Sequence, residues 1–263
     1  MTEKSLEQKI EMVADLVSKS ERIMIFTGAG VSTESGIPDF RSPDGIWSKY
    51  DPEDFTIQRF LSDKEVRKRN WRLLTDSEFK LTGAEPNPAH FAIAELKNMG
   101  KLYCVITQNV DGLHQKAGVP EEMVFQLHGD MSHAKCMKCG RRYPMEEITG
   151  LLDKGVDDPR CMICKGILKP DAVFFGEQLP LEVMMESERR SRTCDLCLVL
   201  GSSLVVYPAA LMPVYAMESK AKVVIINVGP TEMDRMATIL IDGKAGEVAP
   251  RIIARAKEKL RIE

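Results

Sequence analysis

The feature that most constrains the fold is the stretch of residues 22–41, which reads RIMIFTGAGVSTESGIPDFR. Its first part, residues 22–27, predicts a buried parallel strand, because a brief apolar run ends abruptly at Gly28 and Gly30. Glycine lets backbone N–H groups approach a diphosphate closely, so the turn is a candidate dinucleotide site. A plain strand-to-helix turn is the alternative for the two glycines taken alone.

The same stretch is an incomplete dehydrogenase fingerprint. Thr33 stands at the third glycine position, and no second strand ending in an acidic residue follows about 20 residues later. The sequence therefore favours nucleotide binding and disfavours a standard dehydrogenase.

The composition is that of an ordinary globular protein. Of the 263 residues, 44% are hydrophobic and 29% are charged, and no run approaches the roughly 18 apolar residues of a membrane span. This length suits one large domain with insertions, or two smaller domains. The N-terminal sequence MTEKSLEQKIEM lacks the apolar region of a signal peptide, so we expect a cytoplasmic location and no membrane partner.

The charge argues against a protein held on nucleic acid by bulk electrostatics. The formal net charge is −3, and we expect no direct sequence-specific binding to nucleic acid. Two basic clusters, residues 67–69 and 189–192, are interpreted as solvated helix faces.

Apolar runs that alternate with helical patterns predict the fold class. Besides residues 22–27, the expected strands are residues 102–107, 123–127, 196–200, 222–227 and 238–241. The expected helices are residues 6–17, 88–99, 208–217 and 246–260. This alternation predicts an α/β protein with a doubly wound, parallel, Rossmann-like sheet.

Two insertions interrupt that pattern. A charged, helix-like stretch that extends to about Leu81 predicts a small helical insertion, and the cysteine-rich stretch after Met131 predicts an inserted zinc-ribbon module. We divide the chain into a Rossmann-like dinucleotide-binding domain (1–45, 86–130 and 168–263), a helical insertion (46–85) and a zinc-binding module (131–167).

Polar residues follow most of the expected strands. They include Gln108, Asn109 and Asp111 after one strand, and His128 after the next. Ligands of open α/β sheets bind beyond the carboxyl ends of the strands, so these residues predict a polar-lined cleft that suits a dinucleotide. The position of His128 at a strand end favours a functional role, whereas His90, His114 and His133 are expected to be structural. An alternative role for Asp111 is to cap the following helix.

Four of the seven cysteines have the spacing of a metal site. They form C-x2-C-x21-C-x2-C, with Cys136, Cys139, Cys161 and Cys164 as the expected ligands. Four thiolates complete a tetrahedral Zn²⁺ site and leave no position for water, so the zinc is expected to be structural. A third pair, Cys194 and Cys197, has no second pair nearby and is expected to pack in the core.

Taken together, the motifs resemble those of the sirtuin family over residues 6–260. They are GAGVSTESGIPDFR (28–41), TQNVDGLH (107–114), LHG (127–129), the two cysteine pairs, FFGE (174–177), GSSLVVYPA (201–209) and INVG (226–229). The resemblance is to compact microbial-type members. It implies an NAD-dependent protein lysine deacylase that produces nicotinamide, O-acetyl-ADP-ribose and deacylated lysine. NAD is then consumed as a co-substrate, which accounts for the incomplete dehydrogenase fingerprint.

The resemblance also assigns roles to residues. His128 is the expected general base, and Asn109 and Asp111 are expected to orient the ribose and its water and to hold the nicotinamide carboxamide. The cofactor-binding residues that it implies are Gly28, Ala29, Gly30, Thr33, Asp39, Phe40, Arg41, Gln108, Asn109, Val110, Asp111, His128, Gly201, Ser202, Ser203, Asn227, Val228, Lys244 and Ala245. Within this set, Phe40 shields the reactive carbon from water and Arg41 binds phosphate.

The partners that the resemblance implies are proteins with acetylated or acylated lysines. The peptide is expected to add as a strand between two extended stretches, with Val173, Phe175, Gly176, Glu177, Val205, Val206 and Tyr207 as substrate-binding residues. Succinyl- and malonyl-specific members carry a Tyr-x-x-Arg pair, and the nearest candidate here, residues 69–72, lacks the tyrosine. Acetyl or longer neutral acyl groups are therefore favoured. The alternatives are a protein mono-ADP-ribosyltransferase and a non-catalytic NAD- or zinc-binding module.

Overall fold

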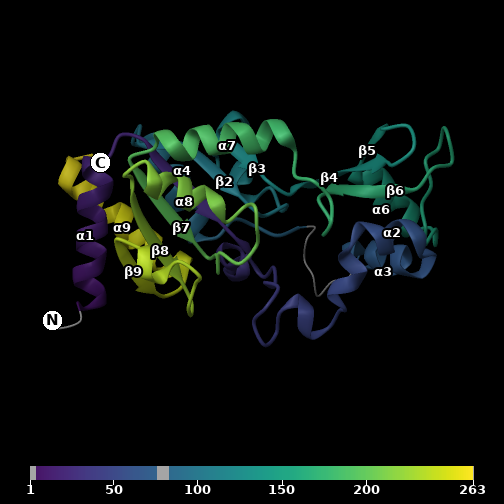
Figure 1. Cartoon of the computed structure of the whole chain (residues 1–263), viewed down its shortest axis with the longest axis horizontal. Helices are drawn as coiled ribbons and strands as arrows, with labels where there is room; N and C mark the ends of the chain where they lie inside the picture. Colours follow the sequence, from purple (N-terminus) through teal and green to yellow (C-terminus); the bar gives the residue numbers. More distant parts are fainter. Residues whose placement is uncertain (1–3, 76–82, 263) are drawn as a thin grey trace.

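A six-stranded parallel sheet forms the core of the large lobe in this computed structural model, which describes residues 4–75 and 83–262 (Figure 1). The strand order is β3-β2-β1-β7-β8-β9. The strands are β1 (Ile23–Thr27), β2 (Leu102–Thr107), β3 (Val124–Gln126), β7 (Leu196–Leu200), β8 (Lys222–Asn227) and β9 (Ile239–Asp242). Each neighbouring pair is parallel, so the predicted doubly wound sheet is confirmed.

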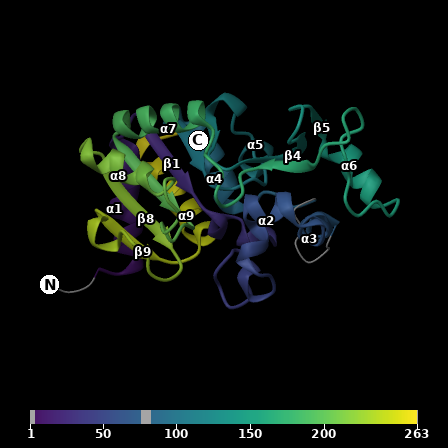
Figure 2. The same ribbon diagram turned by 45° about the vertical axis from the view of Figure 1, so that its right-hand side comes forward.

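Helices cover both faces of this sheet (Figure 2). Alternate residues of β1 point to opposite faces, with Ile23 and Ile25 in one core and Met24 and Phe26 in the other. The first core includes α1 (Leu6–Lys19), α4 (Pro88–Asn98) and α9 (Ala245–Leu260). The second includes α7 (Leu181–Thr193) and α8 (Leu211–Glu218). Apolar burial on both faces explains why the strands have nearly continuous apolar sequences.

The small lobe combines the two predicted insertions. Its antiparallel sheet has the order β5-β4-β6, formed by β4 (Gly129–Cys136), β5 (Arg142–Pro144) and β6 (Leu168–Ala172). Around it lie α2 (Ile57–Ser62), α3 (Lys64–Thr75) and α6 (Met145–Leu152) (Figure 1). Phe60 and Trp71 of the helical insertion share one core with Tyr143 and Leu168 of the zinc module. The two insertions therefore pack as one lobe.

The proposed division of the chain into domains stays a prediction. β6 lies within the part assigned to the Rossmann-like domain and pairs with β4 in the small sheet. The end of the predicted helical stretch, near Leu81, lies outside the described residues.

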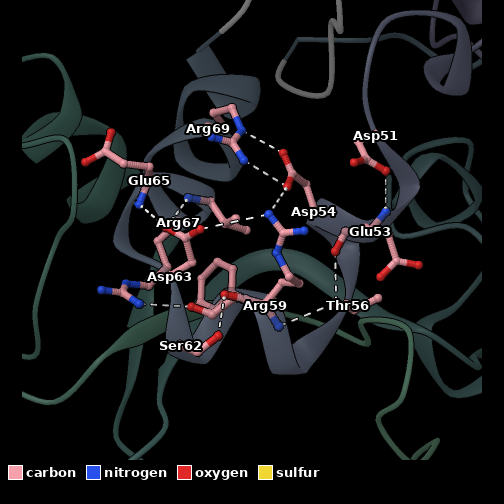
Figure 3. Close-up of polar contacts among 12 residues, drawn as sticks. Asp51, Glu53, Asp54, Thr56, Arg59, Ser62, Asp63, Glu65, Arg67 and Arg69 are labelled. Atoms are coloured by element: carbon pink, nitrogen blue, oxygen red, sulfur yellow. Dashed lines mark hydrogen bonds and ion pairs between the residues drawn. The ribbon is translucent and has the colours of Figure 1, made fainter.

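Charged side chains hold the small lobe together (Figure 3). Arg69 forms two hydrogen bonds of 2.6 and 2.9 Å with Asp54, and Arg59 lies 3.6 Å from the same carboxylate. Arg67 is buried and forms a 3.0 Å ion pair with the buried Asp158. The interpretation of residues 67–69 as a solvated face is therefore wrong, because two of the three arginine and lysine side chains neutralise partly or fully buried carboxylates.

The second basic cluster, on α7, is partly solvated. Arg189 and Arg192 have side chains that are 56% and 40% exposed, whereas Arg190 lies over the ring of Tyr103, 4.5 Å from its centroid. The α7 cluster thus has two exposed members and one that stacks on the body of the large lobe.

The remaining elements are short. They are α5 (Leu113–Lys116) and the 3-10 turns η1 (Ala29–Val31), η2 (Thr33–Ser35), η3 (Ile46–Ser48), η4 (Pro52–Phe55), η5 (Glu121–Met123) and η6 (Asp234–Met236). Across residues 4–75 and 83–262, no helix combines the length and the apolar character needed to cross a bilayer.

The register of the large sheet brings the polar strand ends to one edge. Thr27 lies opposite Thr107 and Leu200, and Asn227 lies opposite Asp242. The chain reverses its direction across the sheet between β1 and β7, which is where open α/β proteins form ligand crevices. The site is built at this edge.

Candidate active site

The turn after β1 packs tightly against the turn after β7. Gly28 N–H donates to Leu200 O over 3.3 Å, and Gly30 N–H donates to Gly201 O over 2.9 Å. A Cβ at position 30 would lie 2.9 Å from the Cα of Gly201, which is too close for any side chain. Gly201 has a φ of 60°. In this structure the N–H groups of Gly28 and Gly30 donate to the carbonyls of Leu200 and Gly201. The absence of a side chain at these glycines lets the turns after β1 and β7 pack closely.

Ser32 joins the glycine-rich turn to the loop after β2. Its buried hydroxyl donates to Asp111 Oδ2 over 2.7 Å and accepts from Asn109 Nδ2 over 3.1 Å. Asp111 Oδ1 also accepts from the N–H of Leu113, the first residue of α5, while the N-cap position itself is Gly112. Ser32 was not among the predicted site residues, although its place inside the GAGVSTESG motif was a usable signal.

His128 is held through one ring nitrogen. Nδ1 lies 2.9 Å from Gln108 O, and because a carbonyl oxygen only accepts, Nδ1 carries the proton of the neutral ring. Nε2 is then left with a lone pair that can accept a proton. Burial lowers the pKa of His128, and the hydrogen bond to Gln108 opposes that effect in part. The geometry therefore suits a general base that is neutral near pH 7.

Gln108 extends this network to the turn after β7. Its Nε2 donates to Ser202 Oγ over 2.9 Å, and Ser202 Oγ also accepts from Leu204 N–H. Val110 follows in the same loop, where its carbonyl accepts from Met131 N–H. The predicted residues of three strand ends are thus linked in one hydrogen-bonded cluster.

Buried hydrogen bonds among Thr27, Thr107 and His114 fix the start of the loop after β2. Thr27 Oγ1 donates to Thr107 Oγ1 over 2.7 Å and lies 2.9 Å from His114 Nε2, while Thr107 Oγ1 accepts from Asn109 N–H. Burial lowers the pKa of His114 to about 3, and that of His90, whose ring is 5.0 Å away, to about 4. Both histidines are therefore buried and neutral, as expected for structural residues.

The loop of Asp39, Phe40 and Arg41 packs on aromatic residues. Asp39 Oδ1 accepts from Arg41 N–H, which fixes the turn. The ring of Phe40 lies 5.1 Å from Trp47, and Trp47 lies 6.1 Å from Phe175. Trp47, which was not predicted, therefore links the cofactor loop to the predicted substrate residues. Its position in the SPDGIWSKY stretch gave no sign of this, because the contact depends on the fold.

The predicted adenine end lies at the turns after β7 and β8. Asn227 Nδ2 donates to the carbonyls of Val228 and Gly229, and Ser203 O accepts from Glu232 N–H. The neighbouring predicted residues differ in exposure: Val228, Lys244 and the hydroxyl-bearing Thr33 are exposed, Ala29 is half-buried and Ala245 is buried at the start of α9.

One further contact ties these turns to the glycine-rich loop. Glu34 Oε2 accepts from Gly246 N–H over 2.7 Å. The carboxylate of Glu34 thus occupies the N-terminus of α9.

The first predicted peptide-binding stretch, residues 173–177, lies beside His128. Val173 N–H donates to His128 O over 2.7 Å, and Phe175 exchanges two hydrogen bonds of 3.0 Å with Phe55 O and Ile57 N–H. Phe175, Val205 and Tyr207 are 46%, 38% and 59% exposed, so large apolar side chains line this surface. The other predicted substrate-binding residues are Gly176 and Glu177 in the first stretch and Val206 in the second.

Residues 69–72, the nearest candidate for the Tyr-x-x-Arg pair, lie on α3 of the small lobe. The guanidinium of Arg69 is bound by Asp54, and Trp71 is fully buried in the core of the small lobe. The preference for neutral acyl groups stays a prediction.

The four predicted metal ligands converge at the zinc-ribbon tip. Their Sγ atoms all lie within 4.8 Å of one another, with Cys136 and Cys164 3.5 Å apart and Cys139 and Cys161 3.7 Å apart. A tetrahedral Zn²⁺ with Zn–S bonds of about 2.3 Å sets the sulfurs about 3.8 Å apart. Backbone N–H groups of Cys139 and Cys164 point at the first sulfur of each pair. The donor set and spacing therefore fit a structural zinc.

The third cysteine pair packs in the core, as predicted. Cys194 is 5% exposed and Cys197 is fully buried in the core beneath α7 and α8. Burial raises the pKa of both thiols, so they are poor nucleophiles and poor ligands.

The whole chain is similar to known enzymes. The model of the Sir2 family matches residues 28–208. An NAD-dependent protein deacylase 2 from Pyrobaculum aerophilum is 45% identical over 95% of this chain and 96% of the relative. One from Archaeoglobus fulgidus is 44% identical over 98% of this chain and 100% of the relative. A solved complex of Sir2 with a p53 peptide and NAD⁺ has a TM-score of 0.84 and 38% identity, covering 97% of this chain and 99% of that one. This chain belongs to the Sir2 family, the sirtuins.

Proposed function

We propose that the protein is an NAD-dependent protein lysine deacylase that yields nicotinamide, O-acetyl-ADP-ribose and the deacylated lysine. The observation that carries the proposal is the arrangement around His128, whose Nδ1 is fixed on Gln108 O at 2.9 Å. The same strand edge holds Asn109 and Asp111, which Ser32 clamps together. The two relatives named above, both NAD-dependent protein deacylases, support this reading.

The proposed roles follow from the chemistry of each side chain. NAD supplies the ADP-ribosyl group that accepts the acyl group. His128 Nε2 takes a proton from a ribose hydroxyl, while the clamped Asn109 and Asp111 orient the ribose and the nicotinamide carboxamide. Phe40, which packs on Trp47, keeps water from the reacting carbon.

The proposed substrate is a protein segment that carries a neutral acyl-lysine. It pairs as a strand between residues 173–177 and 205–207, so that backbone hydrogen bonds provide affinity. The apolar side chains of Val173 and Phe175 line the path of the acyl-lysine. The four cysteines hold Zn²⁺, which stabilises the small lobe and takes no part in the chemistry.

An acetyl-lysine peptide incubated with and without NAD tests the proposal. We expect deacetylated peptide only in the presence of NAD, as detected by mass spectrometry. ADP-ribose attached to protein in the absence of peptide deacetylation would instead identify a mono-ADP-ribosyltransferase.

A further inference from the structure

A buried lysine lies next to the predicted peptide-binding segment. Lys169 on β6 is 5% exposed, and its ammonium group forms an ion pair of 3.0 Å with Glu177. The same group donates to Pro170 O over 3.0 Å and to Ala172 O over 2.5 Å. Its Nζ also lies 4.6 Å from the centroid of the Phe174 ring. All of these partners belong to residues 170–177.

Such a lysine is costly to bury, so its partners are informative. Desolvation lowers the pKa of Lys169, and the carboxylate of Glu177 opposes this effect. A charge removed from water remains only where hydrogen bonds and a counter-charge compensate it. For Lys169 the compensating groups all belong to residues 170–177. The ammonium group therefore holds the backbone and side chains of this segment in a fixed arrangement.

Glu177 connects the ammonium group of Lys169 to the backbone of residues 174–177. Its Oε2 accepts from Phe174 N–H over 2.7 Å, and Glu177 N–H donates to Phe174 O over 3.0 Å. Residues 174–177 thus form a closed turn, in which Gly176 has a φ of 85°. The ring of Phe174 is locked from the other side by an edge contact of 5.0 Å with Phe60.

The segment has two further attachments, and both lead to the site. Val173 N–H is bonded to His128 O, and Phe175 pairs with Phe55 and Ile57 of the helical insertion. The buried ion pair therefore sets the course of the segment between the general base and the small lobe. A strand-adding ligand depends on the direction of the backbone N–H and C=O groups, so it is sensitive to this course.

We infer that Lys169, acting through Glu177, is a positioning residue for the acyl-lysine peptide and not for NAD. The inference rests on the proposed function. The hydrogen bonds and the ion pair of Lys169 go to residues 170–177, whereas the Asp111 carboxylate accepts from Ser32 and the Ser202 hydroxyl accepts from Gln108.

The test uses Lys169→Met, which keeps the length of the side chain and removes the charge. Lys135→Met is the matched control, because Lys135 lies opposite Lys169 in the β4–β6 register and is exposed. Lys169→Arg tests rescue by a retained cation, and Glu177→Gln removes the counter-charge. Each full-length variant is assayed for the KM of an acetyl-lysine peptide, the KM of NAD, kcat, zinc content and melting temperature.

We expect Lys169→Met to raise the KM of the peptide about 10- to 100-fold, since a buried charged group loses its partner. The KM of NAD is expected to change less than about twofold, because none of the expected cofactor-binding residues lies within residues 170–177. Lys169→Arg recovers most of the peptide affinity, and Lys135→Met matches the wild type. Direct binding of a fluorescent acetyl-lysine peptide follows the same order.

An unchanged peptide KM in a folded Lys169→Met variant overturns the inference. A parallel rise in both KM values with a lower melting temperature also overturns it, because that pattern indicates a general structural role. If Lys169→Met does not fold, Glu177→Gln decides by the same criteria. A wild-type protein that binds no acetyl-lysine peptide and releases no nicotinamide contradicts the proposed function itself.

Discussion

Ser32 Oγ donates a 2.7 Å hydrogen bond to Asp111 Oδ2, and this contact joins two loops that are 79 residues apart in the chain. The same hydroxyl accepts from Asn109 Nδ2. One serine therefore sets the relative position of the two side chains that are proposed to orient the ribose and nicotinamide.

Ser32→Ala should lower kcat/KM for NAD about 10- to 100-fold, because the hydrogen bond from the buried Ser32 hydroxyl to the half-buried Asp111 carboxylate contributes about 1–3 kcal/mol to positioning. Steady-state kinetics with varied NAD provide the measurement. Ser18→Ala on α1 is the control, since the Ser18 hydroxyl donates to Asp15 O within its own helix. Wild-type kinetics for Ser32→Ala would show that the clamp does not position these groups.

His128→Ala should retain NAD binding while kcat for deacetylation falls about 10²- to 10⁴-fold, the usual contribution of a general base. Calorimetric titration with NAD and a peptide assay measure the two effects separately. Undiminished turnover would remove His128 from the proposed mechanism. Because burial lowers the pKa of His128, the acidic limb of kcat/KM should have its midpoint below about 6.5.

The buried histidine pair should make the fold sensitive to mild acid. The pKa values of about 4 for His90 and about 3 for His114 lie below the value of about 6.5 in an unfolded chain. Between pH 6.5 and 5 the unfolded chain therefore binds protons that the folded protein does not. The free energy of unfolding falls as the pH falls, by about 2 kcal/mol per histidine over this range.

Urea unfolding at pH 5, 6 and 7 measures that slope. His90→Gln should reduce it, because this substitution removes one of the two buried groups that bind a proton only in the unfolded chain. Equal slopes in the wild type and His90→Gln would contradict the assignment.

Loss of one metal ligand should unfold the tip of the small lobe. Cys161→Ser is expected to lose its zinc and to melt at a lower temperature, because a structural zinc site couples metal binding to folding. Metal analysis and thermal denaturation provide the measurements. Cys194→Ala should keep one zinc per chain, since Cys194 belongs to the large lobe. One zinc per chain in Cys161→Ser would show that the ligand set is different.

The large sheet was predictable because its strands are buried on both faces. Residues 102–107, 196–200 and 222–227 were predicted with the bounds that β2, β7 and β8 have in the structure. Their apolar runs end at polar residues, and the parallel register then places those residues at one edge. The zinc ligands were predictable for a similar reason, since thiol spacing encodes a metal site locally.

The small sheet left no such pattern. β4, which reads GDMSHAKC, has only Ala134 and Cys136 buried, and β6 contains Pro170. These strands are stabilised by pairing with segments that are distant in the sequence and by the nearby four-cysteine site. Local β-propensity reveals neither of these two contributions. Nor does sequence tell Arg67, which is buried, from an exposed neighbour, because its partner Asp158 lies 91 residues away.

The residues of the site also divide into those that local sequence reveals and those that only the fold brings together. Asn109, Asp111 and His128 were visible as polar strand ends, and Ser32 lies inside the glycine-rich motif, whereas the contacts of Trp47 and Lys169 are created only by the fold. The two glycines after β1 were expected to serve a diphosphate, and in the structure their N–H groups bond to the neighbouring turn.

Mass analysis of the products formed from NAD and an acetyl-lysine peptide tests the central claim most directly. The account predicts one free nicotinamide and one O-acetyl-ADP-ribose for every lysine that is deacetylated, formed about 10²- to 10⁴-fold more slowly in His128→Ala. Release of free acetate while NAD remains intact would contradict it.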